Sequence, residues 1–215
     1  MTDFIVAHWL DIVTTVLGLA YILFEYKASV WMWVVGFLMQ ALGIVLYYRK
    51  GLYADCGMEF YYLSMTVYGY WRWISRPPKL GGDRGLKKGV SDAGSDPQPP
   101  NLGGLAISFF PKKLMLPWLA VIGVVWAVIY WLLVTFTNSN VPLADSFTTA
   151  LSIFGIWALA HKYLEQWFIW IAVDVVTSVL YYYKDIPFKG SLYALYVVIA
   201  ILGYRKWRRM MKEQA

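Results

Sequence analysis

The sequence predicts an all-α integral membrane protein with seven transmembrane helices. Of its 215 residues, 60% are hydrophobic and only 15% are charged, and the mean hydropathy is +0.51. A soluble domain carries about a quarter charged residues. The apolar stretches are continuous and lack the alternation of a membrane β-barrel, and each is close to the roughly 20 residues that cross a bilayer as a helix.

Short connections and one long polar stretch separate the apolar stretches. The expected spans are 4–24, 30–48, 53–74, 114–136, 147–161, 167–183 and 190–207. The stretch 76–111 is rich in Gly, Pro, Ser and Asp, so we expect a mobile loop there. The predicted parts are a first three-helix unit over 1–75, a flexible cytoplasmic loop over 76–112, a linker helix over 113–137 and a second three-helix unit with a basic tail over 146–215.

Lys and Arg residues are distributed unevenly between the two sides of the predicted helices. With seven spans, fifteen of the 19 lie on the side of the C-terminus, which also holds the long loop. The positive-inside rule then places the C-terminus and the long loop in the cytoplasm and the N-terminus outside. The net charge of +6 therefore marks topology beside anionic lipid, and nucleic-acid binding is not expected.

Two parts of the chain are similar to each other at a separation near 135 residues. The matched pairs are Lys27 and Lys162, Trp33 and Trp170, Gly69 and Gly203, and Trp73 and Trp207. A single helix between two three-helix units gives both units the same orientation, so we expect two parallel repeats. In such a plan the substrate site lies at mid-membrane between the repeats.

Asp174 is a carboxylate at the middle of the sixth span. Helical spacing places Trp170 and Thr177 on the same face. An acid at this depth is costly in a bilayer, so it normally faces a protein interior or an aqueous cavity and has a function. The alternative is a structural polar contact between helices.

A second polar face lies on the third span, where Asp55, Glu59, Tyr62 and Thr66 follow at helical spacing. Asp55 is close to the start of the helix, where compensation of the helix dipole explains it equally well. For Glu59 we weigh substrate binding against a structural pair.

The second span adds Trp33 and Gln40, which the repeat assigns as partners of Trp170 and Thr177. Together the polar faces offer carboxylates, an amide, hydroxyls and large aromatic rings. Aromatic faces attract cations and stack on flat rings, so such a cavity suits a small cation with a flat ring.

Other chemistries lack their residues. Cys56 is the single cysteine, and neither His8 nor His161 has a second histidine at ligand spacing, so we expect no metal site and no cofactor. No hydrolase, ATPase or zincin motif occurs, so an enzyme is not expected. Glu25 lies near the end of the first span, where a solvated position is expected.

Three runs of residues carry a resemblance to a known family. They are FEYKASVWMWVVGFLMQ, LYADCGMEFYYLSMTVYGYWRW and LSIFGIWALAHKYLEQWFIWIAVDVVTSVLYYYK. They contain a W-x-x-W-x-x-x-[N/D] pattern at Trp167, Trp170 and Asp174, and YG-x-W-x-W from Tyr68 to Trp73. In these runs the chain resembles the PnuC family of vitamin-precursor transporters, and the likeness fails only in the 76–111 loop.

The resemblance implies a 3+1+3 fold similar to the SWEET sugar transporters. It also implies uptake of nicotinamide riboside by facilitated diffusion, followed by trapping by a cytoplasmic kinase in NAD biosynthesis. We expect Asp174 and Glu59 to hold the cationic or hydroxylated part of the substrate and Trp170 and Trp33 to stack on its ring. The remaining hydrogen bonds would come from Gln40, Tyr62, Thr66 and Thr177.

The chain departs from the riboside pattern at several of these positions. Glu59, Thr66 and Asp174 stand where amides are common, and Met39 stands beside Gln40 where an asparagine is expected. Carboxylates suit the pyridinium of nicotinamide riboside and the thiazolium of thiamine equally, so thiamine is the alternative substrate. A proton-coupled vitamin symporter is the alternative mechanism, and the sequence leaves a homo-oligomer open.

Overall fold

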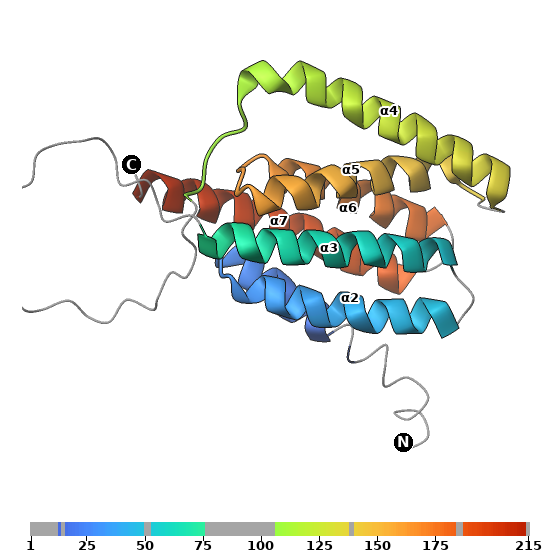
Figure 1. The fold of residues 1–215 in the computed structure, drawn as a ribbon, viewed down its shortest axis with the longest axis horizontal. Helices are drawn as coiled ribbons and strands as arrows, with labels where there is room; N and C mark the ends of the chain where they lie inside the picture. Colours follow the sequence, from blue (N-terminus) through green and yellow to red (C-terminus); the bar gives the residue numbers. More distant parts are fainter. Residues whose placement is uncertain are drawn as a thin grey trace, which may run out of the picture.

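The computed structural model describes residues 13, 16–49, 53–75, 106–137, 140–183 and 187–213, and its elements there are helices. A first helical segment, Val16–Tyr26, precedes six labelled helices (Figure 1). These are α2 (Trp31–Arg49), α3 (Tyr53–Ser75), α4 (Lys112–Phe136), α5 (Pro142–Ala160), α6 (Gln166–Tyr183) and α7 (Pro187–Glu213). The predicted all-helical class is confirmed.

Two helix boundaries differ from the predicted spans by more than a few residues. Helix α5 begins at Pro142 because proline in the first turn has no N–H to leave unpaired and already has helical φ. Helix α7 continues to Glu213, and Lys212 lies in its last turn, where a cation compensates the negative end of the helix dipole. The basic tail is therefore helical.

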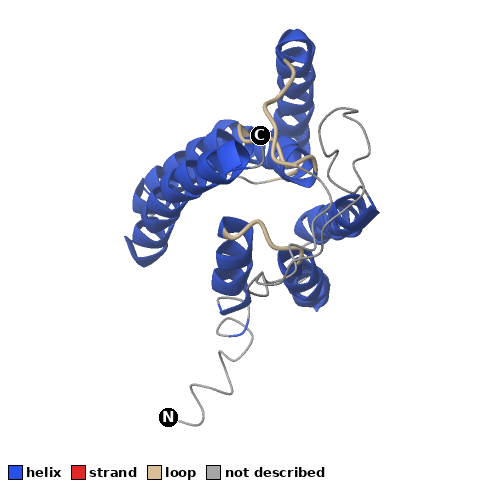
Figure 2. Cartoon of the chain, turned by 90° about the vertical axis from the view of Figure 1, so that its left-hand side faces the viewer, coloured by secondary structure: helices blue, strands red, loops and turns tan. Residues whose placement is uncertain are grey.

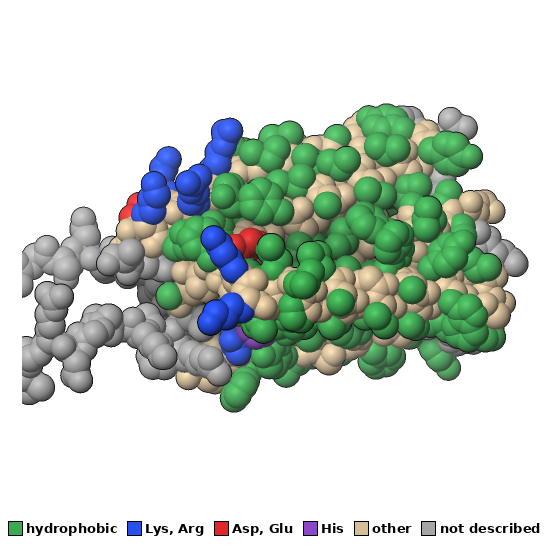
Figure 3. Space-filling model, turned by 90° about the horizontal axis from the view of Figure 1, so that it is seen from above, with side chains coloured by type: hydrophobic (Ala, Val, Ile, Leu, Met, Phe, Trp, Pro, Cys, Tyr) green, Lys and Arg blue, Asp and Glu red, His purple; other side chains and the backbone are tan. Residues whose placement is uncertain are grey.

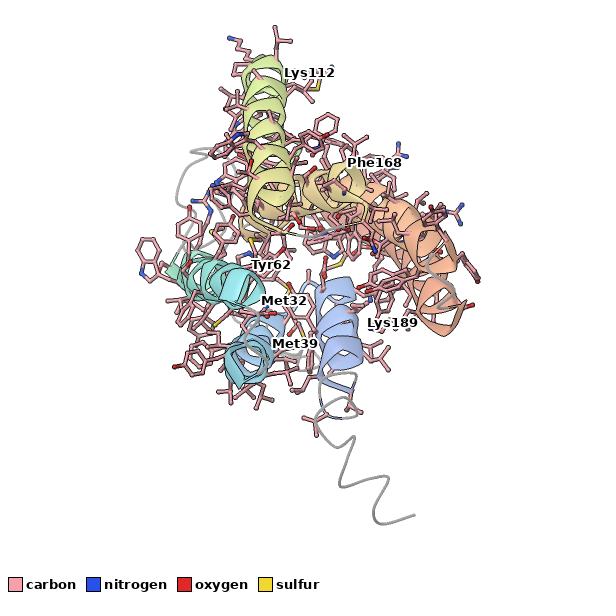
Figure 4. The ribbon with its side chains drawn as sticks, turned by 90° about the vertical axis from the view of Figure 1, so that its right-hand side faces the viewer. Met32, Met39, Tyr62, Lys112, Phe168 and Lys189 are labelled. Atoms are coloured by element: carbon pink, nitrogen blue, oxygen red, sulfur yellow. The ribbon has the colours of Figure 1, made fainter. Side chains whose placement is uncertain are left out.

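The helices pack as pairs that form one bundle. Contacts join α2 to α3, α6 to α7, α5 to α6 and α3 to α5, and α4 packs on α5. Viewed along their axes, the first helical segment lies between α2 and α7, on the side of the bundle opposite to α4 (Figures 2 and 4). No residue of α4 is buried, and α4 and α5 are long and apolar enough to cross a membrane.

Apolar side chains cover most of the face that carries α4, and Lys and Arg side chains gather at one end of it (Figure 3). At this end α4 begins, with Lys112 and Lys113, and α7 ends, with Arg208 and Arg209 among its last residues (Figure 1). An apolar belt with a basic end is typical of a protein that lies in a bilayer beside anionic lipid headgroups.

Two tryptophans each lie directly on a glycine of the next helix. A Cβ atom on Gly69 would lie 2.4 Å from Cη2 of Trp33, and a Cβ atom on Gly203 would lie 2.4 Å from Cη2 of Trp167. Only glycine allows this approach. Each indole then meets a second one edge-on, at 5.6 Å and 87° or 88°; the two pairs are Trp33 with Trp73 and Trp167 with Trp207.

The turns before α2 and α6, the helices that carry Trp33 and Trp167, also have the same geometry as each other. Ala28 has φ 50° and Lys162 has φ 53°, the left-handed conformation that ends many helices. In both turns the next amide bonds back five residues, from Ser29 N–H to the Phe24 carbonyl and from Tyr163 N–H to the Ala158 carbonyl. The separation is 134 residues in every case, which supports the predicted repeat.

This common separation corrects the predicted pairing of the repeats. Trp33 corresponds to Trp167 and not to Trp170, because the two share their glycine and indole contacts. Gln40 then corresponds to Asp174 and not to Thr177. The pairing of Lys27 with Lys162 is one residue out of register, because Lys162 corresponds to Ala28. Because Trp167 and Trp170 are only three residues apart in α6, either could be aligned with Trp33 from the sequence.

The end of the predicted mobile loop is packed in the structure. Ser108 N–H donates to the Lys162 carbonyl at 3.1 Å and Leu164 N–H donates to the Ser108 carbonyl at 2.9 Å. Phe110 N–H donates to Glu165 Oε2 at 2.8 Å. Residues 106–110 are therefore tied to the turn between α5 and α6, and residues 76–105 lie outside the described residues.

Candidate functional site

Asp174 lies in the interior of the bundle, in the middle of α6. Its side chain is 8% exposed. Its charge acts on Tyr196 of α7 and on Glu25 of the first helical segment, so it faces these two elements. Within the described residues no cationic side chain is among the charges that act on it. A carboxylate so placed can accept a cation or hydrogen-bond donors from a substrate.

Glu25 is buried, which contradicts the prediction of a solvated position. Its side chain is 4% exposed, although it stands one residue before the end of the first helical segment. The reason is tertiary. The C-terminal part of α7 covers this end, and Trp207 Nε1 donates to the Glu25 carbonyl at 3.0 Å.

The polar face of α3 is directed toward α2 and α5. The Glu59 carboxyl group packs on Gly43 of α2, where an added Cβ would lie 2.8 Å from its Cδ. The Tyr62 side chain lies beside Ser152 of α5. Thr66 is 2% exposed, and its hydroxyl donates to the Tyr62 carbonyl at 2.8 Å. The three predicted residues therefore share one face, as expected.

Tyr21 connects this face with the Glu25 carboxyl group, which lies on the same side of the first helical segment as Tyr21. Its ring would lie 3.1 Å from a Cβ on Gly36, and the Thr66 hydroxyl would lie 3.6 Å from the same point. Glu25 lies one turn after Tyr21 in the same helix, and its charge interacts with the Tyr21 hydroxyl. Polar side chains of α3 and of α6 thus both lie close to the first helical segment.

Gln40 and Thr177 belong to the same level of the bundle. Gln40 is 9% exposed in α2, and it occupies the position that Asp174 occupies in α6, seven residues after the glycine-packed tryptophan. Thr177 is half-buried and lies about one turn beyond Asp174. An amide and a carboxylate at related depths give the site one neutral and one anionic acceptor.

The two predicted stacking residues lie in different places. Trp170 is half-buried and packs against Gly155 of α5, and its Nε1 makes no hydrogen bond within the part of the chain that the structure describes. Trp33 is 1% exposed and is enclosed by Gly69 and Trp73. Trp170 lies near Asp174, whereas Trp33 holds helices α2 and α3 together near their end and presents no free face in this conformation.

Two grooves that the structure contains lie elsewhere. The larger is open and apolar and is lined by residues such as Trp126, Phe147 and Val176, and the smaller lies between α4 and α5 at Trp118 and Phe154. None of the predicted site residues lines either groove. Since both open beside α4, on the apolar outer surface, we assign them to contact with lipid and not to the substrate.

Sequence analysis missed Tyr21, Glu25 and Gln166 as neighbours of the site. Gln166 is 0% exposed at the start of α6, and its side chain lies beside the Glu25 carboxyl group. A signal was present, because Tyr21 and Glu25 are spaced i, i+4 and so share one face of an otherwise apolar helix. The side chain of Asp55, also considered from sequence, lies outside the described residues.

The side chains around Asp174 and on α3 are of the kinds that recognise a small polar molecule. The arrangement offers carboxylates, amides, hydroxyls and an indole, and within the described residues no three His, Cys, Asp or Glu side chains are grouped to hold a metal ion. Such groups can bind a small polar molecule and release it without changing it.

Comparisons with known proteins identify the family. Residues 8–209 match the family described as nicotinamide mononucleotide transporter. The riboflavin/roseoflavin transporter RibM of Streptomyces davaonensis is 24% identical over 203 residues, covering 93% of this chain and 84% of RibM. The nicotinamide riboside transporter PnuC of Escherichia coli is 21% identical over 230 residues, covering 96% of this chain and 87% of PnuC.

A solved structure has the same fold. It is described as the crystal structure of the vitamin B3 transporter PnuC, and it matches with a TM-score of 0.72 and 21% identity over 99% of this chain and 86% of that one. The family consists of membrane transporters and not of enzymes, as the sequence predicted. On the match over 8–209 and these relatives, the chain belongs to the PnuC family of multi-pass membrane transporters.

Proposed function

We propose that this transporter imports nicotinamide riboside by facilitated diffusion, through a site at mid-membrane between two parallel three-helix repeats. The observation that carries the proposal is the buried Asp174, which within the described residues has another carboxylate, Glu25, as its charged neighbour and no cation. Burying a carboxylate without a counter-charge costs several kcal/mol. A pyridinium ring supplies that charge when it binds.

The roles of the other residues follow from their positions. Trp170 presents its indole near Asp174 and stacks on the pyridinium ring. Gln40, Thr177, Tyr62 and Thr66 supply hydrogen bonds to the ribose hydroxyls and the carboxamide. Glu59 remains part of this proposal as a second acceptor, on the side of α3.

Transport proceeds by rocking of one repeat against the other about this site. The charge distribution supports a cytoplasmic C-terminus and an external N-terminus in a bacterial inner membrane. No ion gradient is required if a cytoplasmic kinase phosphorylates the imported riboside and so prevents its return. A protonophore that abolishes uptake into proteoliposomes would favour the proton-coupled alternative.

Riboflavin is the second candidate substrate because the relative RibM is described as a riboflavin/roseoflavin transporter. Its isoalloxazine ring is flat and uncharged, so it gains stacking but gives Asp174 no counter-charge. The charge of the ring therefore distinguishes nicotinamide riboside from riboflavin as the substrate. Thiamine is cationic and belongs in the same test.

The experiment is calorimetric binding of the three vitamins to purified protein in detergent. We expect nicotinamide riboside to bind and Asp174→Asn to weaken it about tenfold or more, as for the loss of a hydrogen bond to a charged group. Asp145→Asn, in the first turn of α5, is the matched control and leaves binding unchanged. Binding of riboflavin alone or thiamine alone would reject the riboside, and equal affinities of wild type and Asp174→Asn would remove Asp174 from the site.

A further inference from the structure

Glu25 and Gln166 are two buried polar side chains that the mid-membrane site leaves unused. Glu25 is 4% exposed and Gln166 is 0% exposed. They come from the two halves of the chain, since Glu25 belongs to the first helical segment and Gln166 is the first residue of α6. The Gln166 side chain lies beside the Glu25 carboxyl group.

Part of the hydrogen-bonding capacity of these two side chains is unfilled, although they lie close enough to interact with each other. Within the residues that the structure describes, Glu25 Oε1 makes no hydrogen bond, and neither does the oxygen or the nitrogen of the Gln166 amide. A buried polar group without a partner costs about 1–3 kcal/mol, and more when it is charged. Three such atoms at one place are available to a ligand that supplies the missing contacts.

The two side chains lie on a line with the mid-membrane site. Gln166, Trp170 and Asp174 follow at i, i+4 and i+8 on α6, so Gln166 is about 12 Å from Asp174 along the helix axis. Trp170 Nε1 also lacks a hydrogen bond among the described residues. The charge of Asp174 acts on Glu25. A row of polar groups thus leads from Asp174 to Gln166 at the start of α6.

At that end the two halves of the chain close against each other beside Glu25. Trp207 Nε1 donates to the Glu25 carbonyl at 3.0 Å, and Trp207 lies 6.4 Å from Trp73 between ring centroids. The Lys162 ammonium lies 4.1 Å from the centre of the Trp73 ring. Glu25 therefore lies beside contacts that close the bundle between Asp174 and this end.

We propose that Glu25 and Gln166 form a second station for the substrate, between the Asp174 site and the end of the bundle where α7 ends. The inference rests on the proposed function, because it requires a cationic ring with an amide substituent. The Glu25 carboxylate neutralises the pyridinium. The Gln166 amide donates to and accepts from the carboxamide of nicotinamide riboside, which has the same donor and acceptor pair.

The experiment compares two ribosides in proteoliposomes that contain the full chain. Nicotinamide riboside carries the ring charge, and its reduced dihydro form keeps the ribose and carboxamide without it. Glu25→Gln removes only the charge. We expect it to slow uptake of the charged riboside about tenfold and to leave uptake of the reduced riboside within about twofold. Equilibrium binding of the charged riboside, which reports the Asp174 site, stays within about threefold.

Gln166→Leu tests the other half of the station. Because both ribosides carry the carboxamide, we expect this variant to slow the uptake of both by about the same factor, near tenfold. Asp145→Asn is again the control, at the first turn of α5. Size-exclusion elution of each variant confirms that it is folded before reconstitution.

The outcomes separate this inference from the proposed function. Wild-type uptake in Glu25→Gln, or an equal loss for both ribosides, overturns the charge role of Glu25 while the Asp174 site stands. Loss of binding as severe as that of Asp174→Asn also overturns it, because Glu25 then belongs to one site with Asp174. A wild-type protein that takes up neither riboside overturns both proposals.

Discussion

Replacing Gly203 by alanine tests the closest contact in the bundle. The added Cβ would lie 2.4, 2.6 and 2.6 Å from three carbon atoms of the Trp167 indole. The indole has no space to move, because Trp167 is 2% exposed and Trp207 meets it edge-on at 5.6 Å. Helices α6 and α7 must therefore separate locally.

The expected cost combines two opposing terms. Overpacking of a buried site costs about 1–3 kcal/mol, and this contact lies at the upper end because the neighbour is a rigid ring. Exchange of glycine for alanine within a helix returns up to about 1 kcal/mol. A net loss of about 2 kcal/mol lowers the melting temperature of a chain of this size by roughly 4–8 °C.

The assay is thermal unfolding in detergent with a thiol-reactive dye at a fixed heating rate. Cys56 is the single cysteine and is 6% exposed, so the dye reports its exposure on unfolding. Gly123→Ala is the matched control, since nothing lies within 4 Å of its added Cβ. Gly69→Ala repeats the test in the other half, where the Trp33 contact has the same length.

Two results would refute this reasoning. Equal melting temperatures of Gly203→Ala and Gly123→Ala would show that the close contact is relaxed at no cost. A double variant that combines Gly203→Ala with Trp167→Phe supplies a smaller ring and should recover part of the loss. A further drop in this variant would place the strain elsewhere.

Three further predictions concern contacts between elements. Burial lowers the pKa of Lys162 from 10.5 to about 8. Between these pH values the unfolded chain binds more protons than the folded one, so the free energy of unfolding should rise with pH from about 8 to 10. Lys162→Met should lack this rise in the same dye assay, and an equal rise in both proteins would exclude Lys162 as its source. Ser178→Ala should lower the free energy of unfolding by about 0.5–1.5 kcal/mol, because the Ser178 hydroxyl donates to the Gly190 carbonyl of α7 at 2.8 Å. Ser64→Ala should leave stability unchanged, because the Ser64 hydroxyl bonds within its own helix. Equal losses in the two variants would contradict the role of the Ser178 hydrogen bond. Tyr61→Phe should cost a similar amount by removing the 3.0 Å hydrogen bond to the Ile153 carbonyl of α5, whereas Tyr130→Phe on the exposed face of α4 should leave the melting temperature unchanged.

Several features of the site could be predicted because they depend on local spacing. Asp174 lies in the interior, as the cost of a carboxylate in lipid requires. Glu59, Tyr62 and Thr66 share a face because their spacing matches the helical period. The roles assigned to them in transport stay proposals.

Other features depend on which helices become neighbours. Trp33 and Trp170 look equivalent in sequence, yet Trp33 is enclosed by Gly69 and Trp73, and Trp170 remains near Asp174. Glu25 stands near the end of an apolar segment, a place that is solvated in a single helix. It is buried because Trp207, far along the chain, covers it.

The sequence alone determined the class of protein and the helical segments, because hydrophobic length and side-chain periodicity act within a few turns of one helix. The family was indicated by the resemblance of three motif-bearing runs, which needs no tertiary contact to be seen. The tertiary structure decided the register of the two similar halves and the partners of the buried carboxylates. Those depend on contacts such as indole against glycine and Glu25 beside Gln166, which join residues more than thirty positions apart. No local pattern encodes such contacts, since they exist only once the helices have packed.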